Sequence, residues 1–221
     1  MLKLVSAVVA GLTAMGGWAV VTVQDLPEYF VAGRAYTIEF RIRQHGRHFL
    51  NNLEPQLIVS TSAPRLGGLV GGANEQRIPA AARSAEGTYA ATFTAPATGP
   101  LYLTIKSSFG ASNLRLYPAP VIAAGATPPT MALADRGRAL FVAKGCNACH
   151  MNADLVDRPD NQQIKAGPEL GGHRLARDYV IQKLKSPASE NMPNLGLSDG
   201  EVAAIATFLS GERAAATGGS R

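Results

Sequence analysis

Two cysteines and a histidine stand together in the run Cys146-Asn-Ala-Cys149-His150, and the chain has no other cysteine. Two thiols at this spacing on a tight turn can each add to one vinyl group of a haem, and the imidazole that follows then lies under the iron. A redox-active cysteine pair would require a thioredoxin-like strand-helix-strand context, and a zinc site would require two further soft ligands. The surrounding segment is helical in pattern. The motif therefore predicts one covalently attached haem c, with Cys146 and Cys149 as attachment points and His150 as an iron ligand.

The elements that would position this motif are helices, because apolar residues recur with helical spacing after residue 133. The pattern predicts one helix over 133–144 and a second over 175–185. A third helix is expected to begin at Ser198-Asp-Gly-Glu201, which fits a capping box, and to end at Gly211.

Residues 134–211, about a third of the chain, resemble a class I cytochrome c domain. The glycine and the aromatic residue of Gly137-Arg-Ala-Leu-Phe141 match the motif at which the first and last helices of that family cross. Gly167-Pro168-Glu-Leu170 resembles the loop on the proximal side of the haem. The resemblance implies that the carbonyl of Pro168 accepts the Nδ1 proton of the ligating histidine, and that Leu170 packs on the haem.

The sixth iron ligand is expected from the stretch before the last helix. Met192-Pro-Asn-Leu-Gly-Leu197 resembles the distal methionine loop of the same family, so Met192 is the candidate. Met151 follows the proximal histidine directly and cannot reach the opposite face, whereas His173 is the remaining competitor. A methionine here would close both axial positions and raise the reduction potential.

The preceding part of the chain has the pattern of short strands separated by Gly, Pro and Asn turn signals. Residues 86–105 look like the strand, turn and strand found late in many bacterial immunoglobulin-like modules. We therefore expect two domains: an antiparallel, immunoglobulin-like β-sandwich over 17–122 and an all-α cytochrome c fold over 134–221. Residues 123–133 read as a linker. The expected strands are 19–23, 36–42, 55–59, 88–94, 101–105 and 114–117.

The first residues predict the compartment. Lys3 is followed by an apolar run to Ala14, and Ala14-Met-Gly16 offers small residues at the spacing that a signal peptidase favours. We expect residues 1–16 to be a cleaved signal peptide and the mature chain to be periplasmic. The alternative is an uncleaved membrane anchor, for which the run is short against a span of about 20 residues.

Charge and the remaining polar clusters add little chemistry. The net charge of +5 comes from scattered basic residues, which argues against a nucleic-acid partner. His45 and His48 are interpreted as a polar loop, with a copper or zinc site as the alternative. Four lysines of the C-terminal part offer either a basic rim around the haem crevice or scattered solvated side chains; they are Lys144, Lys165, Lys183 and Lys185.

These features favour a mono-haem electron carrier whose partner is a redox protein or a membrane respiratory or photosynthetic complex, with the β-sandwich as a docking or assembly module. Membrane association would then come through that partner or through an uncleaved N-terminus. A haem-dependent oxidoreductase enzyme is the alternative, but a di-haem peroxidase would need a second Cys-x-x-Cys-His motif and an open iron. A structural subunit of a larger complex is the other alternative.

Overall fold

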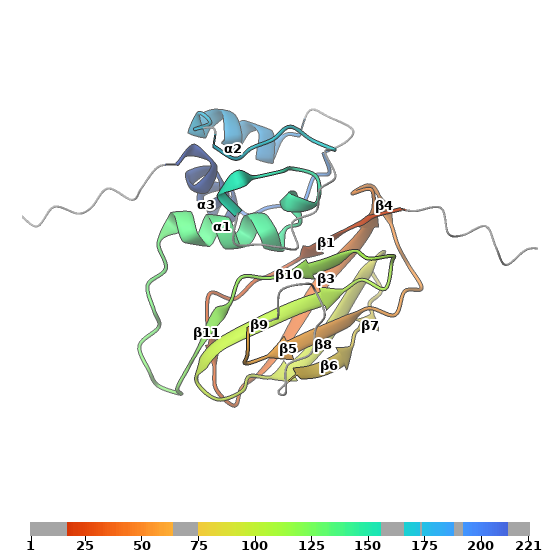
Figure 1. Ribbon diagram of the computed structural model, residues 1–221, viewed down its shortest axis with the longest axis vertical. Helices are drawn as coiled ribbons and strands as arrows, with labels where there is room; N and C mark the ends of the chain where they lie inside the picture. Colours follow the sequence, from red (N-terminus) through yellow and green to blue (C-terminus); the bar gives the residue numbers. More distant parts are fainter. Residues whose placement is uncertain (1–16, 64–74, 156–165, 173, 188–191, 212–221) are drawn as a thin grey trace, which may run out of the picture.

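The computed structural model describes residues 17–63, 75–155, 166–172, 174–187 and 192–211. Strands occupy the chain up to residue 122, and helices occupy it from residue 133 (Figure 1). We call these two parts the β-region and the helical region. Residues 123–132 carry no helix or strand and run between them.

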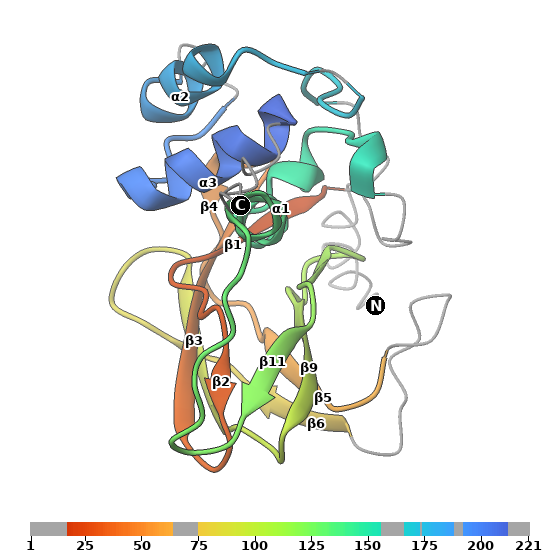
Figure 2. The same cartoon turned by 90° about the vertical axis from the view of Figure 1, so that its left-hand side faces the viewer.

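The β-region contains two sheets that face each other, with β3 in one and β5 and β9 in the other (Figure 2). The first sheet has the order β1-β3-β8-β7, with β4 also paired to β3. The second has the order β2-β11-β9-β5-β6, with β10 also paired to β9. The strands are β1 (Ala19–Val23), β2 (Phe30–Val31), β3 (Ala35–Gln44), β4 (His48–Phe49), β5 (Gln56–Ser60), β6 (Glu75–Pro79), β7 (Ala81–Ala82), β8 (Thr88–Thr94), β9 (Gly99–Lys106), β10 (Asn113–Arg115) and β11 (Ala119–Ile122).

Nearly all strand pairs are antiparallel, as the sequence predicts, but β2 and β11 pair in parallel, with Phe30 opposite Val121. The core between the sheets is built from alternate residues of the strands, since successive side chains of a strand point to opposite faces. Phe40 and Leu57, for example, are both fully buried. The buried side chains of the β-region join those of the helical region in one continuous hydrophobic core.

β1 is buried on both faces, which distinguishes it from an ordinary edge strand. Ala19, Val21 and Val23 belong to the core between the sheets. Val20 and Thr22 lie on the opposite face and are still only 3% and 2% exposed. The helical region provides the cover, because α1 lies over β1 in both views (Figures 1 and 2).

The helical region is built on three helices: α1 (Leu133–Ala143), α2 (Arg177–Lys185) and α3 (Asp199–Ser210). α3 begins with the predicted capping box, in which the Ser198 hydroxyl accepts from the Glu201 amide and the Glu201 carboxylate accepts from the Ser198 amide. It ends at Gly211, which has a φ of 66°. A positive φ is the usual way for glycine to end a helix.

α1 and α3 cross at Gly137. A Cβ atom added to this glycine would lie 1.9 Å from the carbonyl oxygen of Ala204. Beside this crossing the rings of Phe141 and Phe208 meet with their centroids 5.7 Å apart. The glycine and aromatic pair picked out in the sequence therefore forms the contact that the family resemblance implies.

Candidate haem site

The Cys-x-x-Cys-His run forms a tight turn directly after α1. Gly145 adopts a φ of 75°, which favours glycine, and a 3-10 turn, η1, follows over Cys146–Ala148. The amides of Cys149 and His150 both donate to the carbonyl of Cys146, at 3.1 and 2.9 Å. These bonds fold the segment back on itself, so that both thiols and the imidazole belong to one compact turn.

A second loop holds the imidazole in place. Nδ1 of His150 lies 2.8 Å from the carbonyl oxygen of Pro168, and a carbonyl can only accept, so Nδ1 carries the proton. The amide of Gly167 donates to the carbonyl of Cys149 at 2.9 Å, and that of Leu170 donates to Met151 at 2.8 Å. The ring is thus oriented with Nε2 available as a metal ligand.

Gly167 lies close against the same ring, a role that sequence reasoning did not assign to it. A Cβ atom at this position would come within 2.5 Å of Cε1 of His150. Only glycine therefore lets the loop approach closely enough for the bond from the histidine to Pro168. The signal was present in the sequence as the glycine that precedes this proline.

The two thiols are held in the protonated form. Burial, together with the neighbouring Cys149, raises the pKa of Cys146 to about 12. Burial raises the pKa of Cys149 to about 11. Catalytic and redox-exchanging cysteines have lowered pKa values because the thiolate is the reactive species. Neither thiol of the turn therefore has the lowered pKa of a redox-exchanging cysteine.

These pKa values lead to a first prediction. In haem-free protein both thiols should react with iodoacetamide only slowly at pH 7.5, and the rate should climb as the pH approaches about 11. Denatured protein is the control, since its thiols should ionise near pH 9. Unfolded thiols release protons that folded thiols keep, so the haem-free fold should also lose stability over the same rise in pH. Fast labelling of the folded protein at neutral pH would contradict this environment.

Met192 stands at the start of the segment that leads into α3, and its side chain is half-buried. The following turn is closed by the amide of Gly196, which donates to the Asn194 side chain at 2.9 Å. Leu197 packs against the core just before the capping box. Of the two competitors of Met192 for the role of sixth ligand, Met151 adjoins the proximal turn and His173 lies outside the described residues.

Lys144 fits neither alternative, because it belongs neither to an exposed basic rim nor to the solvated side chains. The side chain is only 5% exposed, and its Nζ lies 2.7 Å from a carboxylate oxygen of Glu201. The same ammonium donates to the carbonyl of Gln24 in the β-region. Burial would raise the pKa of Glu201, but Lys144 and the Ser198 amide together hold it below its ordinary value. The lysine therefore forms a buried ion pair at the junction of the two regions.

The other proposed rim lysines behave differently. Nζ of Lys185 lies 2.6 Å from the carboxylate of Asp199 at the surface. The Lys183 ammonium lies 5.5 Å from the centre of the Tyr179 ring. Lys165 lies outside the described residues. The contacts of Lys183 and Lys185 do not direct the two ammonium groups together toward the proximal turn.

His45 lies in the turn between β3 and β4, and His48 begins β4. The ring of His45 packs beside Trp18, with centroids 5.5 Å apart, while His48 lies exposed in β4. Across the described parts of the chain, no three His, Cys, Asp or Glu side chains gather in the manner of a metal centre.

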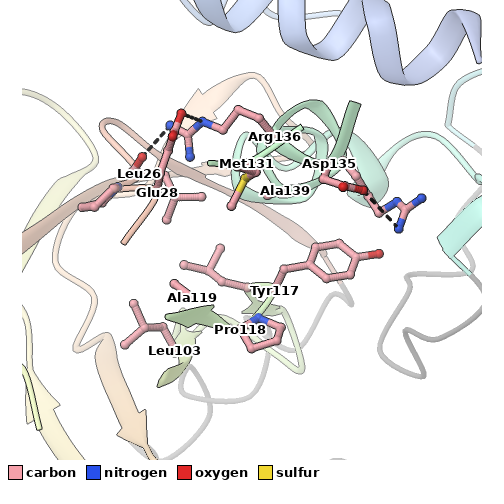
Figure 3. A pocket seen from close by; sticks show the side chains of 13 residues that line it. Leu26, Glu28, Leu103, Tyr117, Pro118, Ala119, Met131, Asp135, Arg136 and Ala139 are labelled. Atoms are coloured by element: carbon pink, nitrogen blue, oxygen red, sulfur yellow. Dashed lines mark hydrogen bonds and ion pairs between the residues drawn. The ribbon is translucent and has the colours of Figure 1, made fainter. Parts of the chain in front are cut away.

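A cavity of about 190 Å³ lies between α1 and the β-region and is lined by residues of both (Figure 3). Arg136 reaches across beside it, donating to the carbonyl of Leu26 at 2.6 Å and pairing with Glu28 at 3.5 Å. Apolar side chains such as Leu103 and Met131 line the rest. None of the predicted haem-binding residues lines this cavity.

The crossed helices and the turn with its oriented histidine define the helical region as a class I cytochrome c domain. Residues 132–209 match the family model described as cytochrome c oxidase, cbb3-type, subunit III. This domain type implies haem c and haem-based electron transfer. A comparison of the whole chain with curated proteins gave no match. Within the described residues, every helix is too short or too polar to span a bilayer.

Proposed function

We propose that this chain is a periplasmic cytochrome that carries one covalently bound haem c and transfers single electrons to or from a membrane respiratory or photosynthetic complex. The observation that carries the proposal is the contact between Nδ1 of His150 and the carbonyl of Pro168. That bond leaves Nε2 of the same ring available to bind a metal, on the turn that also carries both cysteines. The chemistry of this donor set fits a haem.

In this proposal Cys146 and Cys149 would tether the porphyrin, and His150 and Met192 would supply the ligands of the iron. The bound haem supplies reversible one-electron exchange. The hydrogen bond from His150 to Pro168 raises the basicity of the imidazole and keeps its plane fixed during exchange. Leu170, which is half-buried, would pack on the proximal side of the haem.

The choice of partner rests on the family description, which names a subunit of a respiratory oxidase. The β-region, proposed to be an immunoglobulin-like sandwich, would then be the docking or assembly module. The N-terminal apolar run would direct the chain across the inner membrane, either as a cleaved signal peptide or as an anchor. These steps extend the domain assignment to a cellular role.

A redox titration of the purified protein tests this proposal. The visible spectrum should change reversibly with a single one-electron step, and reduced protein should show no turnover with oxygen or peroxide. Isolation from native membranes should bring a respiratory or photosynthetic complex with it. Turnover of peroxide, or a second haem step, would favour an enzyme over a carrier.

A further inference from the structure

The β-region contacts the turn that carries the cysteines. A Cβ atom placed on Gly145 would lie 2.6 Å from Cγ1 of Val20 and 2.6 Å from the carbonyl oxygen of Val21. β1 and the attachment turn are thus in close van der Waals contact, with no room for a side chain between them. The outward face of β1 is buried because this turn covers it.

The same valine also lies beside the turn between β3 and β4, and that turn meets the distal loop. A Cβ atom on Gly46, in the turn between β3 and β4, would lie 3.5 Å from Cγ2 of Val20 and 3.9 Å from Cδ of Pro193. Pro193 directly follows the candidate ligand Met192. Val20 therefore lies between the attachment turn on one side and the β3–β4 turn that meets the distal loop on the other.

Polar contacts join β1 and the turn after it, the end of α1 and the start of α3. The Lys144 ammonium binds the carbonyl of Gln24, just beyond β1, and the carboxylate of Glu201 in α3. The hydroxyl of Thr22 lies 3.4 Å from the carbonyl oxygen of Lys144. Glu201 also accepts from the amide of Ser198, at 3.0 Å, where the distal loop ends.

A polar cavity of about 390 Å³ shows the same convergence, because β1 with its following turn, α1, the distal loop and α3 all line it. Its lining includes Thr22, Gln24, Lys144, Leu195, Gly196 and Glu201. A lysine this deeply buried is costly unless its charge is paired and hydrogen-bonded. The junction is therefore a specific packed interface, whereas a flexibly linked pair of domains would leave these groups in solvent.

We propose that the β-region is a structural part of the haem site, because it packs against the attachment turn and the Met192 loop. Val20 and Lys144 act as positioning residues that hold this turn and this loop at a set spacing. This inference rests on the proposed function. Its consequence is that the β-region controls how readily the methionine leaves the iron. Weakening this packing would let the distal loop move away from the attachment turn, although neither Val20 nor Lys144 touches the haem iron.

Val20→Ala tests the inference with Val59→Ala as its matched control. Val59 is a buried valine, 5% exposed, on β5 in the other sheet. The measurement is the affinity of the oxidised protein for added imidazole, which competes with the methionine. Val20→Ala should raise that affinity about tenfold, the range of a typical coupling between sites, while Val59→Ala should leave it unchanged. Equal affinities in the two variants would overturn the inference.

Lys144→Met gives an independent reading, because it keeps the apolar stem and removes the bonds to Gln24 and Glu201. The imidazole affinity should again rise in Lys144→Met. It should rise less in Lys144→Arg, which keeps a positive charge at this position. If Lys144→Met fails to fold, the valine pair still decides. A wild-type protein without covalent haem would refute the proposed function. A wild-type protein with haem and methionine ligation, together with a Val20→Ala variant whose imidazole affinity equals that of the wild type, would refute only the proposed role of the β-region.

Discussion

Met192→Ala should lower the reduction potential by on the order of 0.1 V or more and should open the iron to added ligands. A thioether favours the reduced iron, and its removal leaves water or an added base on that face. Spectroelectrochemical titration measures the potential, and imidazole or cyanide binding measures the open position. The variant loses only the methionine ligand, so covalent attachment of the haem should be retained.

Met151→Ala is the matched control for this experiment. Met151 is also half-buried, but it adjoins the proximal turn, where its carbonyl accepts from the amide of Leu170. Its replacement should leave the potential close to that of the wild type. A normal potential in Met192→Ala would show that another residue is the sixth ligand, with His173 as the next candidate.

Gly137→Ala should destabilise the protein by about 3 kcal/mol or more, because overpacking a helix crossing forces the backbones apart. The added methyl group would lie 1.9 Å from the Ala204 carbonyl oxygen and 2.9 Å from Cβ of Phe208. Neither atom can move without displacing α3. Urea unfolding followed by circular dichroism measures the loss.

Gly200→Ala is the control for Gly137→Ala. Gly200 lies in the first turn of α3, and a Cβ atom there would meet nothing within 4 Å. Alanine has the higher helix propensity, so this variant should be more stable by about 0.5 to 1 kcal/mol. Equal stability in the two variants would show that α1 and α3 do not cross at Gly137.

The strands that sequence patterns predicted best are those rich in β-branched and aromatic residues. Strands at 19–23 and 88–94 have the predicted bounds. β6 was missed because Glu75–Pro79 is mostly polar and only partly covered. β11 was missed because Pro120 falls inside it, and proline is normally confined to strand edges. Local composition carries no signal for such strands, which form because a neighbour offers them hydrogen bonds.

The proximal half of the candidate site was predictable because its residues are close in sequence or belong to a recognisable motif. The bond between His150 and Pro168 follows the family resemblance. The burial of Lys144 was not predictable, since its partners Glu201 and Gln24 come from distant parts of the chain. A single lysine reads as a solvated charge until the tertiary fold brings a carboxylate and a carbonyl to it.

The central claim is that both thiols of the turn are bonded to one haem. Intact-mass measurement on the denatured, periplasmically matured protein tests it most directly. We predict that the chain retains the mass of one haem after acidified organic solvent has removed any unbound pigment, and that Cys146→Ala combined with Cys149→Ala loses it. A wild-type chain that gives up all its pigment to the solvent, or that keeps two free thiols, would contradict the account.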